Sequence, residues 1–326
     1  MADVNVRPPD GRRLREADRG QLLIVAGLVM AVSLVALVVL LNATIYSENL
    51  ATRGVEGTDR EAADVRANVV GNVEELIDAT NRAEPTVAAS DLVDDVDALE
   101  RRMSRSHAER GATIHLDTDE SRVTSGTYVT TDGNATSLAN ETDATGYTFA
   151  GGIDRTRGFT LDLDRIENMT AASATDEAFH VAFHGSALSE SQEIYVYRNV
   201  TTEEVVVANA TGGGEPTVRC SIAAAPDDEI RLDLTGERIE GTACIGVWPT
   251  ALLAPSDSYT IDFENADAAN GTATATVRSQ GTGTDPDADH AGVSPAVYDA
   301  TIDLRYRTAD FRFETSVRVA PGEPHA

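Results

Sequence analysis

Lysine is missing from this sequence altogether. All 26 basic residues are arginine, and they stand against 54 aspartates and glutamates, which leaves a formal net charge of -28. A surface this acidic repels phosphate backbones, so nucleic acid is excluded as a partner. The negative charge is spread along the chain, as is typical of proteins that work in high salt, where counter-ions screen the self-repulsion.

Cysteine is scarce as well. Two cysteines in 326 residues cannot build a disulfide-dense scaffold or a four-cysteine zinc site. Cys220 and Cys244 are 24 positions apart, each within a segment that reads as a β-strand. Outside the cell we expect them to form one disulfide, with two separate buried thiols as the alternative.

Motifs for catalysis are also missing. The sequence contains no GxSxG, HExxH, P-loop or GxGxxG pattern. His180 and His184 would share one face of a strand, but no third ligand accompanies them, which favours partly exposed histidines over half of a metal site. We therefore predict no catalytic residue, no metal and no cofactor.

One acidic stretch alternates in the way that suits calcium. Asp285, Asp287 and Asp289 occupy every second position. The EF-hand pattern then requires glycine and glutamate where this chain has His290 and Ala296. This favours a solvated loop over a specific cation site.

A single long apolar run is present near the N-terminus. Residues 22–41 contain no charged side chain, and apolar residues occupy every face of a helix built from them. At about 1.5 Å per residue the run spans roughly 30 Å, the thickness of a bilayer hydrocarbon core. It is also longer than the apolar region of a cleaved secretory signal. We therefore expect residues 21–41 to form a transmembrane helix rather than a buried core helix.

Arginine is distributed unevenly around this run. Five arginines precede it and the next is Arg53. By the positive-inside rule, residues 1–20 form a cytoplasmic tail or leader and the rest of the chain is exported. The sequence thus predicts a single-pass protein of the cell membrane with an extracellular C-terminal domain.

The exported part is rich in glycosylation acceptor triplets. Seven of the 13 asparagines stand two residues before a threonine, and all seven follow the apolar run. This enrichment indicates a surface glycoprotein, and the alternative is a threonine-rich chain that produces such triplets by chance. The acceptors are Asn42, Asn134, Asn140, Asn168, Asn199, Asn209 and Asn270.

Helical periodicity continues beyond the run. Apolar residues recur every three or four positions from Ala62 to Leu76 and again from Leu92 to Met103. Residues 42–110 therefore read as a helical stem that ends before Gly111. Breaks are expected near residues 54–58, at Gly54 and Gly57, and near residues 82–90, at Pro85.

The apolar period changes to two after residue 111. Short alternating segments are separated by Gly, Asn, Asp and Pro clusters, with no helical pattern between them. This excludes a βαβ fold and favours an extracellular antiparallel β-sandwich over residues 111–320, followed by a tail at 321–326. The predicted fold class is mainly β, after an N-terminal transmembrane helix and helical stem. The expected strands are 127–131, 159–163, 178–183, 193–197, 203–208, 217–222, 229–234, 242–247, 258–263, 273–277, 301–306 and 311–319.

One short motif, Arg19-Gly20-Gln21, stands directly before the apolar run. It resembles the class III signal of archaeal type IV pilins and archaellins, in which a prepilin peptidase cuts after a glycine that follows a basic residue. The resemblance implies cleavage after Gly20 and a mature chain that begins at Gln21. The order of leader, apolar helix, polar helix and β-rich head is similar too, and the acidic, lysine-free composition resembles that of haloarchaeal proteins. Many pilins have glutamate at the fifth mature position, where this chain has Val25.

Three functions follow from these observations. The first is a minor pilin-like subunit, which assembles by packing its apolar helix against identical helices once the leader is removed. The second is an uncleaved surface protein whose β domain binds a ligand, the cell wall or another cell. The third is an anchored enzyme, which requires a pocket where His180 and His184 meet carboxylates. The expected partners are the lipid bilayer and other pilin-like subunits or envelope components.

Overall fold

The structure is a computed structural model of the chain. It describes residues 11–82, 89–131, 138, 145–171, 173–186, 188–225, 228–255, 257–279, 292–309 and 311–324, without the side chains of residues 11–25, 42–59 and 82. The chain divides into two compact units, Met1–Asp64 and Val65–Ala326.

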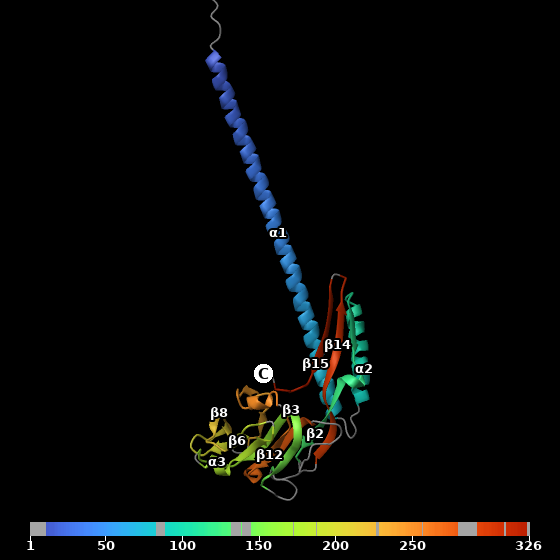
Figure 1. The fold of residues 1–326 in the computed structure, drawn as a ribbon, viewed down its shortest axis with the longest axis vertical. Coiled ribbons are helices and arrows are strands. Elements are labelled where there is room, and N and C mark those ends of the chain that lie inside the picture. Colours follow the sequence, from blue (N-terminus) through green and yellow to red (C-terminus); the bar gives the residue numbers. More distant parts are fainter. Residues whose placement is uncertain are drawn as a thin grey trace, which may run out of the picture. The chain divides into compact units, whose positions relative to one another are not determined.

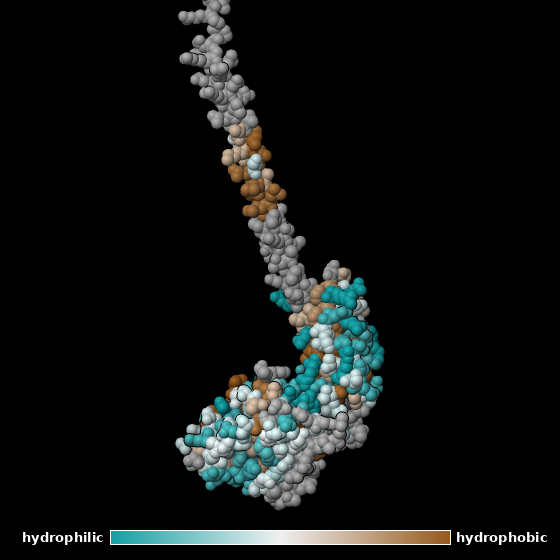
Figure 2. Space-filling view, in the orientation of Figure 1, coloured by the Kyte–Doolittle hydropathy of each residue, from teal (hydrophilic) through white to brown (hydrophobic). Residues whose placement is uncertain are grey.

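The first unit contains most of helix α1, which runs from Gly11 to Arg82. Its large apolar side chains from Leu28 to Leu41 are 56–69% exposed, and Figure 2 shows them as a brown band along the helix. Within the described part of the chain, none of the helices combines the length and the hydrophobicity that a membrane span requires. The side chains of residues 21–25, where the predicted transmembrane segment begins, lie outside that part.

The predicted hinge at residues 54–58 is wrong, because α1 continues through Gly54 and Gly57. A glycine inside a helix costs only about 1 kcal/mol relative to alanine and, unlike proline, keeps its backbone N–H. Two separated glycines therefore weaken a helix without ending it. At the second predicted break α1 ends at Arg82, and α2 begins at Ala89.

Helices pack on one part of the sheet in the second unit. Helix α2 (Ala89–Ala108) buries Leu92, Val96 and Leu99. Figure 1 shows it along the hairpin of strands β14 (Gly292–Arg307) and β15 (Arg312–Val319). The last turns of α1 bury a valine stripe in the same cluster. Gly111 ends this helical region with a φ of 78°, a left-handed conformation that glycine adopts without strain. The strands in this cluster are β1, β14 and β15.

In the described residues, the strands form one hydrogen-bonded sheet in the order β1-β14-β2-β13-β3-β12-β5-β6-β7-β8. The paired strands are antiparallel, apart from the short β4–β6 pair. The prediction of a mainly β, antiparallel fold is thus confirmed. The elements beyond the two helices are β1 Thr113–Asp117, β2 Val123–Thr130, β3 Tyr147–Ile166, β4 Asn168–Met169, α3 Ala174–Glu177, β5 Phe179–His184, β6 Gln192–Asn199, β7 Glu204–Thr211, β8 Thr217–Ala223, β9 Ile230–Asp233, β10 Arg238–Ile239, β11 Thr242–Ala243, β12 Tyr259–Glu264, β13 Ala269–Ser279, β14 Gly292–Arg307 and β15 Arg312–Val319.

The long strand β3 is where the sheet branches. One edge pairs with β13, and the other pairs first with β12 and then with β9. The main core gathers inward side chains from these strands and from β5, β6 and β7. At its centre, the ring of Phe149 lies 4.7 Å from that of Phe263 and 5.4 Å from that of Phe159. Because this core is continuous, the loops at its edge are held in fixed positions.

Candidate functional site

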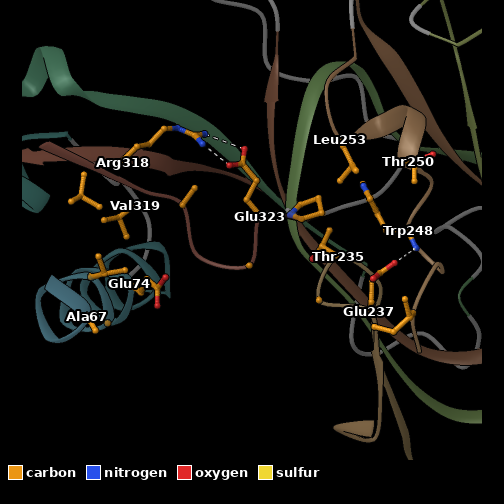
Figure 3. A pocket seen from close by; sticks show the side chains of 18 of the residues that line it. Ala67, Glu74, Thr235, Glu237, Trp248, Thr250, Leu253, Arg318, Val319 and Glu323 are labelled. Carbon is orange, nitrogen blue, oxygen red and sulfur yellow. Dashed lines mark hydrogen bonds and ion pairs between the residues drawn. The ribbon is translucent and has the colours of Figure 1, made fainter. Parts of the chain in front are cut away.

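A cavity of about 1030 Å³ opens at the edge of this core, within the second unit. One wall is the last part of α1, from Arg66 to Glu74, and a second is the end of β15 with the turn that follows it. The third wall is formed by the β9–β10 turn and by residues 244–253, which we name the tryptophan loop. Figure 3 shows how side chains from the three walls surround the cavity.

The tryptophan loop is tied to the neighbouring strands. Cys244 at its start forms a disulfide with Cys220 of β8, as predicted, with their Cα atoms 5.4 Å apart. From β7, Asn209 Nδ2 donates to the carbonyl oxygens of Gly246 at 2.9 Å and Val247 at 2.7 Å. A covalent bond and two amide hydrogen bonds thus fix three residues of the loop, Cys244, Gly246 and Val247.

Glu237 holds the same loop from the turn between β9 and β10. Its Oε1 accepts from the backbone N–H of Gly246 at 2.8 Å and of Trp248 at 3.3 Å. Glu237 has a φ of 51°, in the left-handed region that non-glycine residues rarely adopt. The two hydrogen bonds compensate for that strained backbone, so this carboxylate positions the loop.

Two apolar side chains of the tryptophan loop meet different environments. Trp248 is only 3% exposed and packs edge-on against Phe183, with ring centres 5.4 Å apart. Its indole Nε1 is buried without a hydrogen-bond partner among the described residues. Ile245, by contrast, is 73% exposed at the cavity. Exposed apolar side chains beside a cavity are typical of recognition surfaces.

Arg318 and Glu323 close the opposite wall (Figure 3). Arg318 donates to Asp299 Oδ2 at 2.7 Å and to Glu323 Oε1 at 3.1 Å, and the hydroxyl of Tyr298 donates to the same Glu323 oxygen at 3.0 Å. Burial alone would raise the pKa of Glu323, but the hydrogen bonds from Arg318 and Tyr298 prevail and lower it. Burial and the nearby Glu323 charge raise the pKa of Tyr298, which keeps the hydroxyl protonated as a donor.

A buried arginine of β3 binds the same C-terminal turn. Arg157 is 2% exposed and donates to the carbonyl oxygens of Pro321 at 2.9 Å and Val297 at 2.8 Å. Its Nη1 also lies 3.6 Å from Asp78 Oδ1 of α1. Burial lowers the pKa of Arg157, and Asp78 opposes that shift. This one side chain therefore connects β3, β14, the turn and the helix.

The arrangement suits reversible binding better than covalent chemistry. Glu237, Arg318 and Glu323 are committed to holding the walls, whereas the accessible lining includes apolar side chains such as Ile245 and Leu253. Among the described residues, no group of three His, Cys, Asp or Glu side chains is placed to hold a metal ion.

The two strand histidines do not meet in a pocket. His184 Nδ1 lies 3.0 Å from Asp262 Oδ2 on the neighbouring strand β12, and its side chain is half exposed. His180 instead stacks on Tyr195, with ring centres 4.5 Å apart. Neither lines the cavity that the tryptophan loop borders.

The predicted glycan acceptors are dispersed over the chain. Asn168 is exposed on β4, Asn199 ends β6, Asn209 lies within β7, and Asn270 lies within β13. Asn134 and Asn140 lie outside the described residues, as does the side chain of Asn42 in α1.

Two other predicted features fall largely outside the described part of the chain. The processing residues Arg19, Gly20 and Gln21 lie in the helical backbone of α1, but their side chains are not among those described. The acidic stretch 285–289 lies in the undescribed interval before β14.

The residues that shape the cavity were not among those predicted from the sequence. Trp248 is the single tryptophan of the chain and follows Cys244 by four positions, a signal that could have marked the loop. Glu237, Arg157 and Arg318 carry no such signal, because with 54 acidic and 26 basic residues nothing in the sequence distinguishes one charge from another.

Residues 16–146 match the model of a family of unknown function (DUF7261). The matched region takes in the apolar run, α1 from residue 16 onward, all of α2, β1 and β2, and it ends just before β3. No curated protein and no solved structure matches the chain.

Proposed function

We propose that this chain is a single-pass, glycosylated cell-surface protein, which α1 anchors in the membrane and through which it assembles as a pilin-like subunit. The observation that carries the proposal is the exposure of the apolar residues from Leu28 to Leu41. The described side chains of the run cover residues 26–41, and the sequence Leu22–Val25 extends it to 20 residues. A helix that is apolar on every face is stable only in a bilayer or among other helices.

The charge distribution supports an outward orientation of the β domain. Five arginines before the run hold the N-terminus in the cytoplasm. The disulfide between Cys220 and Cys244 agrees with an oxidising environment. The acceptor triplets beyond the run support a glycosylated surface.

Processing converts the anchor into an assembly element. Cleavage after Gly20 removes all five arginines, so the helix end is no longer retained at the cytoplasmic face. The freed apolar helix can then leave the bilayer by packing on identical helices, where Ala26, Gly27 and Ala31 allow close approach.

The experiment is N-terminal peptide mass spectrometry on protein from the native envelope, with a matched pair of variants. We expect a mature chain that begins at Gln21, and an intact N-terminus when Gly20→Leu places a bulky residue before the cleaved bond. Gly27→Leu is the control for processing alone, because it places the same bulky residue beyond the cleaved bond, where a Cβ meets nothing within 4 Å. Its mature chain should also begin at Gln21, whatever the substitution does to helix packing. A mature N-terminus in Gly20→Leu identical to that of the wild type would refute pilin-type processing.

A second function is an uncleaved, anchored binding module, and the cavity favours it. Ile245 is exposed beside a rigid, disulfide-tied wall, which is the usual construction of a recognition site. An intact wild-type N-terminus in the same experiment, with Arg12 and Arg13 still attached, would favour this function over assembly.

A further inference from the structure

Two of the glycan acceptor triplets use their asparagine amides in opposite ways. We infer that Asn199 carries a glycan, whereas the side-chain amide of Asn209 is a structural tie that stays unmodified. The inference rests on the proposed export of the β domain, since glycan transfer at these triplets takes place on the exported chain. The inference distinguishes two sites that the Asn-x-Thr pattern alone treats as equivalent.

Both hydrogens of the Asn209 side-chain amide are used in hydrogen bonds. Nδ2 carries two hydrogens, and it donates to Gly246 O at 2.9 Å and to Val247 O at 2.7 Å. The residue also lies inside the sheet, because β7 pairs with β6 on one side and with β8 on the other. A sugar on Nδ2 would replace one of the two hydrogens and displace the tryptophan loop, which the disulfide holds in place.

The amide of Asn199 is oriented differently. Its Oδ1 accepts from the backbone N–H of Thr201 at 2.8 Å and of Thr202 at 3.3 Å, while Nδ2 has no hydrogen-bond partner among the described residues. The triplet lies at the turn between β6 and β7, where Val200 is 48% exposed and Thr201 is also exposed. The carbonyl oxygen thus fixes the side chain and leaves the nitrogen available.

The transfer needs an activated sugar, namely an oligosaccharide carried on a lipid phosphate. Asn199 Nδ2 forms a bond to the anomeric carbon of that sugar. The bond from this carbon to the phosphate oxygen breaks, and the lipid phosphate leaves with the electron pair. The proton that the amide gives up is taken by the released phosphate. Because the Asn199 carbonyl oxygen takes no part, its hydrogen bonds to the turn are retained.

Glycopeptide mass spectrometry on the full chain from its native envelope tests the inference directly. The peptide that contains Asn199 is expected to carry a glycan, and the peptide that contains Asn209 to have its unmodified mass. A glycan on Asn209, or an unmodified Asn199, would overturn the inference. A sugar-free chain in the membrane fraction would refute this inference alone, whereas a sugar-free chain in the cytoplasmic fraction would also refute the proposed anchor.

Matched variants separate the structural role from modification. Thr211→Val removes the triplet that begins at Asn209 but leaves the Asn209 amide in place. The mass should therefore change only by the difference between the two side chains, and the thermal midpoint should equal that of the wild type. Asn209→Asp removes the triplet and also turns both loop contacts into oxygen–oxygen contacts, so the midpoint should fall by several degrees. Equal midpoints for the two variants would contradict the structural role.

Asn199→Asp is the complementary variant, because aspartate keeps the oxygen that accepts from the turn. The mass of this variant should be lower than that of the wild type by the mass of one glycan. When both proteins are prepared without sugar, their thermal midpoints should be the same. Retention of the full glycan mass in this variant would show that Asn199 is not the acceptor.

Discussion

The guanidinium group of Arg157 lies 5.7 Å from the centre of the Tyr298 ring, with both side chains inside the protein. Arg278 lies 5.5 Å from the same ring. A cation near an aromatic ring gains electrostatic stabilisation that increases as water is excluded. Asp154, bound by Arg278 at 2.8 Å, supplies a buried countercharge. The junction between β3, β14 and the C-terminal turn is therefore held by charged groups rather than by apolar contact alone.

Replacing Arg157 by methionine should destabilise the domain strongly. Methionine fills a similar volume, but the carbonyl oxygen of Pro321 loses its buried donor, and that of Val297 keeps only the donor from the Asn81 side-chain amide. An unsatisfied buried acceptor costs about 1–3 kcal/mol, so we expect the free energy of unfolding to fall by about 2 kcal/mol. Arg165→Met is the control, because the Arg165 side chain is 59% exposed and its ion pair is a surface one. Chemical denaturation in high salt measures both, and equal losses would contradict the role of Arg157.

Glu323 should make stability depend on pH on the acidic side. Its pKa in the folded protein is lowered below the ordinary value of 4.5, chiefly because hydrogen bonds from Arg318 and Tyr298 outweigh burial. The stabilisation is therefore present above about pH 4.5 and is lost as the pH falls through the lower, folded pKa. Glu323→Gln should be less stable than the wild type at neutral pH, and the difference should shrink in acid. A difference that stays constant with pH, measured by thermal unfolding, would refute this.

Strands that bury one face were predictable from the sequence. Strand β12 alternates buried and half-buried residues from Tyr259 to Phe263, and its predicted range differs from the observed one by one residue at each end. The period of two is visible there because one face packs on the core and the other does not. The disulfide was predictable on different grounds, because the chain has only two cysteines, although Cys244 lies just after β11 rather than on a strand.

The first half of β3 and the tryptophan loop were not predictable in this way. From Tyr147 to Gly158, β3 is buried on parts of both faces and includes Arg157, so no simple alternation marks it. The segment predicted as a strand over 242–247 contains only the short β11. The following residues form a loop that donates to the Glu237 carboxylate and accepts from the Asn209 amide. Such contacts join residues that are distant in the sequence, and a local pattern does not contain them.

Removing the disulfide should loosen the wall of the cavity. Cys220 and Cys244 are separated by 24 positions, and cross-linking a loop of that length stabilises a fold by about 3 kcal/mol in the chain-entropy model. The double variant Cys220→Ser with Cys244→Ser should lose about that much unfolding free energy under oxidising conditions. Reductant should lower the stability of the wild type to the level of the variant and leave the variant unchanged. A wild-type protein insensitive to reductant during unfolding would contradict this expectation.

Salt should stabilise the fold, because the net charge of -28 makes self-repulsion outweigh the surface ion pairs. Raising the salt from about 0.1 M to about 1 M shortens the screening length from about 10 Å to about 3 Å, so the thermal midpoint should rise. Asp94, Asp95 and Asp97 are exposed on α2, and replacing all three by asparagine should raise the midpoint in low salt and reduce the further rise with salt. Sucrose is the control, since it favours burial without screening charge and should stabilise both proteins equally. If salt raised the midpoints of the wild type and the variant by the same amount, repulsion among these three carboxylates would not be the cause of the rise. The stabilisation by salt would then come from acidic residues elsewhere on the surface.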